Sequence, residues 1–326
     1  MKILVICQYY YPEQFRINDI CEELVKKGNE VTVITGLPNY PTGTIQKEYK
    51  FLKKRKENIN GVNVIRSWEI GRRKGSIFRI FNYCSYIISA SMKVLLLPND
   101  YDCVYVYQLS PVTMAIPGIL YKKKNKKKLH LYCLDLWPAS LTTGGIKENS
   151  IFYKIMKKAS SWIYRNADNI SITSKQFEEY FKDKLGLRNQ KMIYLPQYAE
   201  ELYNNIRIEK KEKENVDFVF AGNIGEAQSV ETIVMAASKI TNQNIKIHIV
   251  GDGSSSEKCK KLFNDLNLKN IIFYGRRPME EMQQFYQIAD AMLVTLKKDD
   301  IISMTLPGKV QSYMAARKPI IGAIDR

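Results

Sequence analysis

The sequence predicts an α/β fold made of two doubly wound domains, and three observations lead to this prediction. Apolar runs of strand length alternate with helical patterns along the chain, and this alternation is typical of parallel sheets covered by helices on both faces. The length of 326 residues exceeds one typical domain and suits two. Pro196 and the charged run 209–214 interrupt the alternation. We therefore expect one domain over residues 1–195, a linker over 196–215 and a second domain over 216–326.

The first domain is expected to begin with strand 2–7, helix 15–27 and strand 30–35. Its further strands are expected at residues 62–67, 102–107, 129–134, 169–173 and 191–195. Residues 77–97 predict a long and mostly apolar helix, for which two interpretations remain open. It is either a core helix or a helix whose apolar and basic surface meets a bilayer.

The second domain repeats the alternation of strands and helices. Strands are expected at residues 216–221, 245–250, 270–274, 290–296 and 319–323, and helices at 230–240, 256–266 and 279–288. A doubly wound domain normally continues past such a last strand. Because the sequence stops at Arg326, we expect the second domain to be incomplete at its C-terminus.

Positive charge is concentrated in the first part of the chain. Residues 1–200 contain 32 Lys and Arg against 17 Asp and Glu, a net charge of +15, whereas residues 201–326 contain 18 and 16, a net charge of +2. The basic runs 53–56 and 122–128 are either solvated lysine-rich loops or a surface that meets an anionic partner. They lack interleaved aromatic side chains, and no nucleic-acid-binding motif occurs, so we expect no nucleic acid partner.

The composition also bears on the compartment and on metal binding. The six cysteines lie far apart without a C-x-x-C pair, which favours free thiols in a reducing, cytoplasmic setting. No stretch approaches the roughly 20 apolar residues of a membrane span. The two histidines, His130 and His248, lie in predicted strands and are expected to be packed rather than catalytic. Neither a metal nor a cofactor is expected.

The most informative motif lies near the end of the second domain. Pro307 and Gly308 open a short helix with Lys309 in its first turn. A helix start offers free backbone N–H groups and the positive end of the helix dipole, and an early lysine adds a mobile charge. The motif therefore predicts a cradle for a diphosphate.

Two glycine loops follow strands of the same domain and are expected to border this cradle. Their site residues are Gly222 and Asn223 in one loop, and Gly251, Asp252 and Gly253 in the other. Glycine lets the backbone approach a ligand at the carboxyl ends of parallel strands. Arg276 and Arg277 follow a third strand. Either they reach the same phosphates, or they are solvated side chains of a helix-capping turn.

In the first domain, Asp135 follows a predicted strand in the aromatic, proline-containing run 134–138. It is a candidate for binding sugar hydroxyls or for base chemistry, and the alternative is an Asp that caps the next helix. The loops 9–13 and 38–43 end strands on the same edge and are expected to face the second domain across a cleft. A catalyst without a Ser-His-Asp set or clustered metal ligands must act through positioning and charge stabilisation.

Taken in this order, the motifs resemble the family-4 retaining glycosyltransferases, which have two Rossmann-like domains in the GT-B arrangement. Within that family the chain is similar to the bacterial enzymes that build capsule or O-antigen units of lipopolysaccharide from amino-sugar donors. The resemblance rests on the segments 11–13, 38–41, 135–138, 221–225, 250–253, 274–277 and 307–319. It implies retaining transfer of an N-acetylated amino sugar from a UDP-linked nucleotide-sugar donor, with no metal and no cofactor.

The sequence departs from the family pattern at several site positions. The Arg and Lys that contact the diphosphate in the family are replaced by Asn223 and Gln228. The paired glutamates of the family fall on Met304 and Ser312, and the second of that pair usually holds the ribose. We therefore expect more of the phosphate binding to depend on Lys309, with Arg277 as a second candidate.

The resemblance implies a division of roles among the residues that match the motifs. Catalysis is assigned to Asp135 and Lys309. Donor contacts are assigned to Gly222, Asn223, Gly251, Asp252, Gly253, Arg276, Arg277, Pro307, Gly308, Lys309 and Ser312. The acceptor side is assigned to Tyr11, Pro12, Glu13, Gln14 and Arg16, although this loop lacks the Gly-Gly that usually follows its Pro-Glu.

A polyprenyl-diphosphate-linked saccharide acceptor would account for the basic first domain, because each basic residue near an anionic membrane contributes ~1 kcal/mol. Segments 53–56, 72–74 and 77–97 would then lie on the inner face of the plasma membrane, with the protein cytoplasmic and peripheral. Two alternatives remain open: a non-catalytic nucleotide-sugar-binding protein or fragment, and a nicotinamide-dependent oxidoreductase. The oxidoreductase is disfavoured because the first turn, residues 8–13, contains no glycine.

Overall fold

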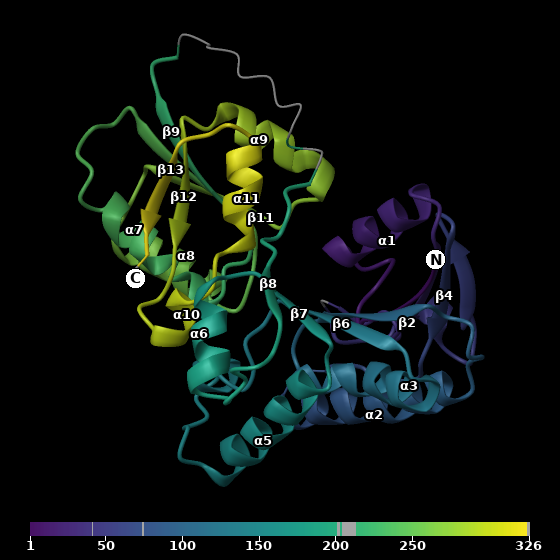
Figure 1. The fold of residues 1–326 in the computed structure, drawn as a ribbon. Helices are drawn as coiled ribbons and strands as arrows, with labels where there is room; N and C mark the ends of the chain where they lie inside the picture. The colour runs from purple at the N-terminus through teal and green to yellow at the C-terminus, as the bar shows by residue number, and fades with distance from the viewer. Residues whose placement is uncertain (41, 74, 201–202, 204–212, 325–326) are drawn as a thin grey trace. The chain divides into compact units, whose positions relative to one another are not determined.

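The computed structural model describes residues 1–40, 42–73, 75–200, 203 and 213–324 (Figure 1). The chain divides into two compact units, Met1–Leu195 and Pro196–Arg326, each with its own sheet. Much of the predicted linker, residues 201–202 and 204–212, lies outside the described residues. The predicted α/β class with two doubly wound, Rossmann-like units is confirmed.

The first unit is built on an eight-stranded sheet. Its strands are β1 (Lys2–Ile6), β2 (Glu30–Thr35), β3 (Lys56–Ile59), β4 (Val62–Arg66), β5 (Cys103–Gln108), β6 (Lys128–Cys133), β7 (Asn169–Ile172) and β8 (Met192–Tyr194). Their order in the sheet is β3-β4-β2-β1-β5-β6-β7-β8, and all neighbours are parallel except β3 and β4. The strand order reverses between β1 and β5, so the loops after these two strands border the place where such sheets bind ligands.

Strand β3 was not predicted, and it is the antiparallel member of the sheet. It pairs with β4 across a two-residue turn, with Ile59 opposite Val62. The turn residues Asn60 and Gly61 have φ values of 51° and 85°. An Asn-Gly pair with positive φ at both positions is the strongest short-range signal of a β-hairpin. This signal is present in the sequence, four residues after the lysine-rich run 53–56.

Helices cover both faces of the first sheet. Helix α1 (Arg16–Lys26) lies on one face, and α2 (Ser76–Leu95) and α3 (Ile116–Asn125) lie together on the other (Figure 1). The later helices are α4 (Ser140–Thr143), α5 (Ile151–Arg165) and α6 (Gln176–Asp183). This arrangement leaves the carboxyl edge of the sheet to loops.

Helix α2 is buried along one narrow stripe. Asn82, Tyr86, Ala90 and Val94 recur at every fourth position and are fully buried, as expected for a helix that rests one face on a sheet. Its outer apolar side chains remain 42% to 67% exposed, and they include Ile77, Ile80, Phe81, Ile88, Met92 and Leu95. The interpretation of residues 77–97 as a core helix therefore holds for the buried stripe and is wrong for the outer side of the helix, whose apolar side chains are exposed. Among the described helices, none combines the length and apolarity needed to cross a bilayer.

The second unit contains a five-stranded parallel sheet. Its strands are β9 (Val216–Ala221), β10 (Ile245–Val250), β11 (Ile271–Gly275), β12 (Ala291–Thr295) and β13 (Ile320–Ala323), in the order β11-β10-β9-β12-β13. Its helices are α7 (Glu231–Ala237), α8 (Ser256–Asp265), α9 (Met282–Ile288), α10 (Asp300–Ser303) and α11 (Gly308–Ala315). Successive residues of β9 enter different cores, since Val219 and Ala221 pack in one cluster and Phe220 in another.

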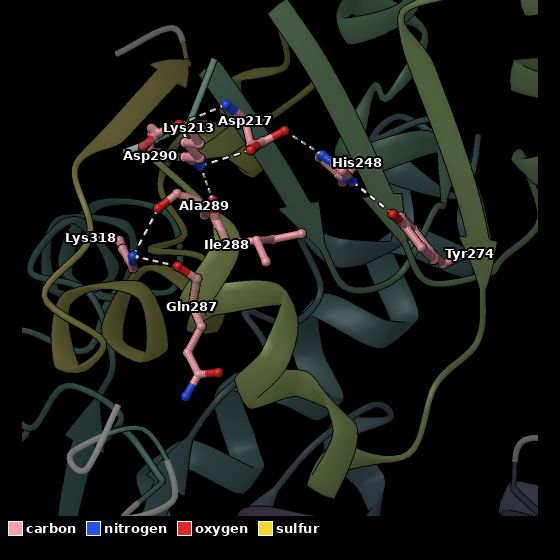
Figure 2. Close-up of polar contacts among 9 residues, drawn as sticks. All are labelled: Lys213, Asp217, His248, Tyr274, Gln287, Ile288, Ala289, Asp290 and Lys318. Atoms are coloured by element: carbon pink, nitrogen blue, oxygen red, sulfur yellow. Dashed lines mark hydrogen bonds and ion pairs between the residues drawn. The ribbon is translucent and has the colours of Figure 1, made fainter. Parts of the chain in front are cut away.

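A polar network begins at the amino-terminal edge of the second sheet and continues along β10 and β11, with Asp217 and His248 buried and Lys213 and Asp290 exposed (Figure 2). The Lys213 ammonium lies 2.7 Å from the Asp217 carboxylate and 2.9 Å from that of Asp290. Asp217 also contacts His248 Nε2 at 2.9 Å, and His248 Nδ1 lies 2.8 Å from the Tyr274 hydroxyl. His248 is 6% exposed, so the prediction that it is packed is confirmed. Asp217 and Asp290 stand at the starts of β9 and β12, and the glycine loops lie at the opposite edge.

Candidate functional site

The two glycine loops of the second unit touch each other at the carboxyl edge of the sheet. Gly222 follows β9 with φ 136°, and Gly251 follows β10 with φ 140°. A Cβ atom on Gly251 would lie 1.8 Å from the carbonyl oxygen of Gly222. A Cβ on Gly253 would likewise lie 2.5 Å from the carbonyl oxygen of Ile224. The loops are therefore packed backbone against backbone, and side chains at Gly251 and Gly253 have no room.

Lys309 reaches this glycine pair from the first turn of α11. Its ammonium lies 3.6 Å from the centroid of the Phe220 ring and 3.2 Å from the position that a Cβ on Gly222 would occupy. The ammonium is buried and has no hydrogen-bond partner among the described residues. Burial lowers the pKa of Lys309 to about 7. The face of the Phe220 ring compensates only part of the hydration that the Lys309 ammonium loses on burial. Binding of an anion beside the ammonium would therefore be favourable.

Tyr313 fixes helix α11 against the end of β9. Its hydroxyl donates to the Ala221 carbonyl at 2.9 Å and accepts from the Ala221 N–H at 3.0 Å. Tyr313 is fully buried, and its ring packs edge-on against Tyr286 at 5.5 Å. Because Tyr313 and Lys309 are four residues apart on one helix, this anchor holds the lysine at the glycine pair.

Ser312 has an acidic partner that the sequence did not reveal. Its hydroxyl donates to the Glu200 carboxylate at 2.8 Å. Glu200 comes from the predicted linker, 112 positions earlier in the chain, and no local pattern connects the two residues. A carboxylate is therefore present beside Ser312, where the family pattern places one on the helix itself.

The remaining polar side chains of the glycine loops hold the loops in shape. Asn223 Nδ2 donates to Gln228 Oε1 at 3.0 Å, and the Gly225 N–H donates to the same oxygen at 3.2 Å. Asp252 accepts from the Gly253 N–H at 2.8 Å. The Ser256 hydroxyl, and after it this N–H, lower the pKa of Asp252. Asn223 and Gln228 thus bond to each other, and the contact of Asn223 with a donor stays a prediction.

The two arginines after β11 differ in their surroundings. Arg277 Nε donates to the Tyr274 carbonyl at 3.2 Å, and its Nη1 lies 3.6 Å from the Glu281 carboxylate. This is the geometry of the capping-turn alternative. Arg276 is exposed, and its charge contributes to the lowered pKa of Asp252. Arg276 is therefore the better placed of the two to meet an anion beside the glycine loops.

Asp135 is held by three side-chain donors of the first unit. Its carboxylate accepts from the hydroxyls of Ser110 and Ser140 and from Trp137 Nε1, the last at 3.0 Å. The helix-cap alternative is wrong, because α4 begins after Ala139 without any side-chain cap. Asp135 lies at the carboxyl edge after β6, and its role in catalysis stays a prediction.

The predicted acceptor loop is organised around the buried carboxylate of Glu13. This carboxylate accepts from the N–H groups of Asn39 and Tyr40, at 2.7 Å and 2.5 Å, and ties the first two loops of the sheet together. Burial raises the pKa of Glu13 to about 7. Pro12 and Gln14 are exposed, and Tyr11 and Arg16 are partly exposed. Glu13 thus supports the loop, whereas its neighbours present side chains to solvent.

Comparison with known proteins bears on the family and the fold. Residues 203–323 match the family model described as Glycosyl transferases group 1. WbjE of Pseudomonas aeruginosa, named as a glycosyltransferase, is 26% identical over 202 residues, which cover 59% of this chain and 50% of WbjE. The matched part therefore spans about half the length of that relative.

Two further proteins cover nearly the whole chain. WcaI of Escherichia coli K12, named as a glycosyl transferase of colanic acid biosynthesis, is 23% identical over 340 residues, covering 97% of this chain and 81% of WcaI. The crystal structure of Anabaena HepE in complex with UDP-glucose has a TM-score of 0.64 at 13% identity, covering 99% of this chain and 80% of HepE. At this identity the structural similarity shows the fold alone. The resemblance inferred from the motifs is therefore supported: residues 203–323 match the group 1 glycosyltransferase family model, and the chain shares its fold with HepE.

Proposed function

We propose that the protein transfers an N-acetylated amino sugar, with retention of configuration, from a UDP-linked donor to a lipid-linked saccharide acceptor in surface polysaccharide biosynthesis. The observation that carries the proposal is the buried Lys309 ammonium, which lies against Gly222 and has no counter-ion among the described residues. A nucleotide diphosphate would supply that counter-ion. The names of WcaI and WbjE and the UDP-glucose complex of HepE support the reaction class and the donor.

The proposed chemistry places the developing charge at Lys309. As the bond between the sugar carbon and the diphosphate oxygen breaks, negative charge grows on the leaving diphosphate. A fixed ammonium and the positive end of the α11 dipole stabilise that charge. The acceptor hydroxyl forms the new bond on the same face of the sugar, and its proton passes to the leaving phosphate. Glycine at 222 and 251 leaves the backbone bare where the diphosphate would approach.

The outer surface of the first unit supports an acceptor embedded in a membrane. Helix α2 carries Arg79 and Lys93 among its exposed apolar side chains in the sequence, and Arg73 lies 5.7 Å from the Phe78 ring. Helix α5, which like α2 contacts the turn Val112–Ala115, exposes its own apolar side chains, and they are Ile151, Phe152, Ile155 and Trp162. Apolar side chains with flanking cations are typical of surfaces that lie on anionic bilayers. We therefore propose a peripheral location on the cytoplasmic face of the membrane.

Titration calorimetry with UDP, GDP and NAD tests the donor site. The wild-type protein should bind UDP most tightly, and Lys309→Met should weaken UDP binding roughly 10- to 100-fold, because a hydrogen bond to a charged group contributes about 1.5–3 kcal/mol. Lys239→Met is the matched control, since Lys239 is exposed in the same unit. Equal, weak binding of all three nucleotides by the wild-type protein and by Lys309→Met would reject the donor proposal.

Liposome flotation tests the membrane location separately. The wild-type protein should float with vesicles that contain anionic lipid and stay unbound with neutral vesicles, because the basic residues act through charge. Replacement of two exposed α2 side chains, Phe81→Ser and Ile88→Ser, should reduce flotation without changing UDP affinity. Equal flotation with both kinds of vesicle would contradict the electrostatic part of the proposal.

A further inference from the structure

Arg72 lies at the carboxyl edge of the first sheet, in the segment between β4 and α2. Its guanidinium Nη1 donates to the Tyr9 hydroxyl at 3.3 Å, and its Cζ lies 5.7 Å from the centroid of the Tyr83 ring. Its backbone N–H donates to Asn39 Oδ1 at 3.2 Å. The guanidinium is therefore fixed in direction by aromatic side chains and is only partly exposed.

A buried polar network makes this position rigid. The Glu69 carboxylate accepts from Gln8 Nε2 at 3.1 Å and from Asn39 Nδ2 at 2.5 Å. Gln8 Nε2 also donates to Asn82 Oδ1 at 2.9 Å, which joins α2 to the end of β1. All four of these residues are no more than 1% exposed. The loops that carry Arg72 are thus held by the interior of the unit, as a binding site requires.

Arg79 adds a second positive charge at the same place. It lies one turn before Tyr83 on α2, and residues four apart share a helix face. Burial raises the pKa of Tyr83, the charges of Arg72 and Arg79 oppose this rise, and the charge of Asp135 adds to it. The Arg72 guanidinium therefore lies beside the Tyr83 ring, and Arg79 lies on the same helix face as this tyrosine.

The positive charge of these arginines is not balanced by an ion pair. Among the described residues, no carboxylate lies within 4.0 Å of the guanidinium of Arg72 or Arg79. The nearby carboxyl groups of Glu13 and Glu69 are buried, and burial raises the pKa of both, that of Glu13 to about 7. They therefore carry less than their full negative charge near neutral pH.

An exposed aromatic side chain borders the site at the start of α2. Phe78 is 39% exposed. Arg73 Cζ lies 5.7 Å from the centroid of the Phe78 ring. An unbalanced guanidinium pair near an exposed aromatic ring suits a ligand that is anionic at one end and hydrocarbon at the other.

We propose that Arg72 and Arg79 bind the diphosphate of an isoprenoid-diphosphate-linked acceptor, with its hydrocarbon chain on Phe78. Planar guanidinium groups match phosphate oxygens through paired N–H donors. The saccharide then extends from the diphosphate toward Asp135, whose charge acts on the pKa of Tyr83 as do those of the two arginines. This inference rests on the proposed function, because it names the anchor of the acceptor that the function requires.

Calorimetry with farnesyl diphosphate, inorganic pyrophosphate and farnesol tests the proposal on the full chain. Farnesyl diphosphate should bind at least 10-fold more tightly than pyrophosphate, and farnesol should not bind measurably. Arg72→Gln and Arg79→Gln should each weaken farnesyl diphosphate binding roughly 10-fold or more. Arg188→Gln removes the same charge from an exposed position of the same unit and should leave the affinity unchanged. Arg72→Lys keeps the charge without the paired donors and should lie between wild type and Arg72→Gln.

The outcomes separate this inference from the donor proposal and from general membrane attraction. UDP affinity should be equal in the wild type, Arg72→Gln and Arg79→Gln. Tryptophan fluorescence in urea, which reports the first unit, should show that both variants fold. A wild-type protein that binds UDP but not farnesyl diphosphate would overturn this inference alone, whereas failure to bind UDP would overturn the proposed function. Flotation with phosphatidylglycerol vesicles should be similar for Arg79→Gln and Arg188→Gln. If Arg79→Gln and Arg188→Gln instead weaken farnesyl diphosphate binding equally, the ligand is attracted by the net charge of the protein, and the proposed site is refuted.

Discussion

Replacing Lys309 by methionine should stabilise the second unit in the absence of a donor, and the gain should depend on pH. Burial lowers the Lys309 pKa from its usual 10.5 to about 7. Since one pKa unit corresponds to about 1.4 kcal/mol, charging this amine costs the folded state roughly 4 to 5 kcal/mol. Methionine fills similar space without a charge, so the variant should avoid this cost.

The sign of the pH dependence follows from proton binding. Between pH 7 and 10.5 the unfolded chain holds a proton on Lys309 that the folded chain has released, so the wild-type free energy of unfolding rises with pH in this window. Below pH 7 both states are protonated and the full penalty is present. The stability advantage of Lys309→Met should therefore be largest at pH 6 and smaller by roughly 2.7 kcal/mol at pH 9.

Urea unfolding followed by circular dichroism measures this difference, and the tryptophans provide an internal control. All three tryptophans, at positions 68, 137 and 162, lie in the first unit, so their fluorescence reports a unit that the substitution does not touch. The fluorescence transition should not move, and the remaining dichroism transition should shift to higher urea. An advantage that is the same at pH 6 and pH 9, or a destabilised variant, would refute the reasoning about the buried ammonium.

Three further outcomes follow from the same structure. At pH 8, UDP binding should be accompanied by the uptake of close to one proton at Lys309, because a bound diphosphate raises the Lys309 pKa from about 7. Calorimetry in buffers of different ionisation enthalpy measures the proton uptake, and zero uptake would contradict the prediction. Gly251→Ala should prevent the native loop from forming, since its Cβ would lie 1.8 Å from the Gly222 oxygen. Gly275→Ala, with open space around the Cβ and φ 70°, should cost only about 1 kcal/mol of stability. Thermal melts compare the two variants, and equal losses of stability would argue against the packed loops. Because the pKa of Glu13 is raised to about 7, the free energy of unfolding of the first unit should fall by roughly 3 kcal/mol as pH rises from 4.5 to 7. Tryptophan fluorescence in urea should show a smaller fall for Glu13→Gln. An identical pH profile for the wild type and Glu13→Gln would exclude Glu13 as the source of this pH dependence.

Much of the fold could be predicted because its strands are buried on both faces and read as apolar runs. The strands beginning at residues 2, 30, 216 and 245 fall within a residue of their predicted bounds. Strand β3 could not be found in this way, since its alternate residues are exposed on the edge of the sheet and its sequence is charged. For α2, the apolar composition hid the narrow buried stripe, because exposed and buried positions carry similar side chains.

The candidate site was predictable where it depends on backbone chemistry. Glycine, proline and an early lysine in a helix have local consequences, and the structure brings Gly222, Gly251 and Lys309 together. Contacts between side chains distant in sequence could not be predicted. The pairing of Glu200 with Ser312 and the approach of Arg72 to Tyr83 depend on loop paths that no local pattern encodes.

The hairpin at the edge of the first sheet also affects how the molecule behaves at high concentration. A strand that added to this edge would have to pair with β3, whose side chains include Lys56 and Glu57 and whose direction opposes that of its neighbour β4. Charged edge strands disfavour pairing between molecules. At the other edge, β8 is only three residues long, which offers few backbone groups to an incoming chain. Neither border of this sheet is a good template for growth into larger β-aggregates, despite its apolar interior.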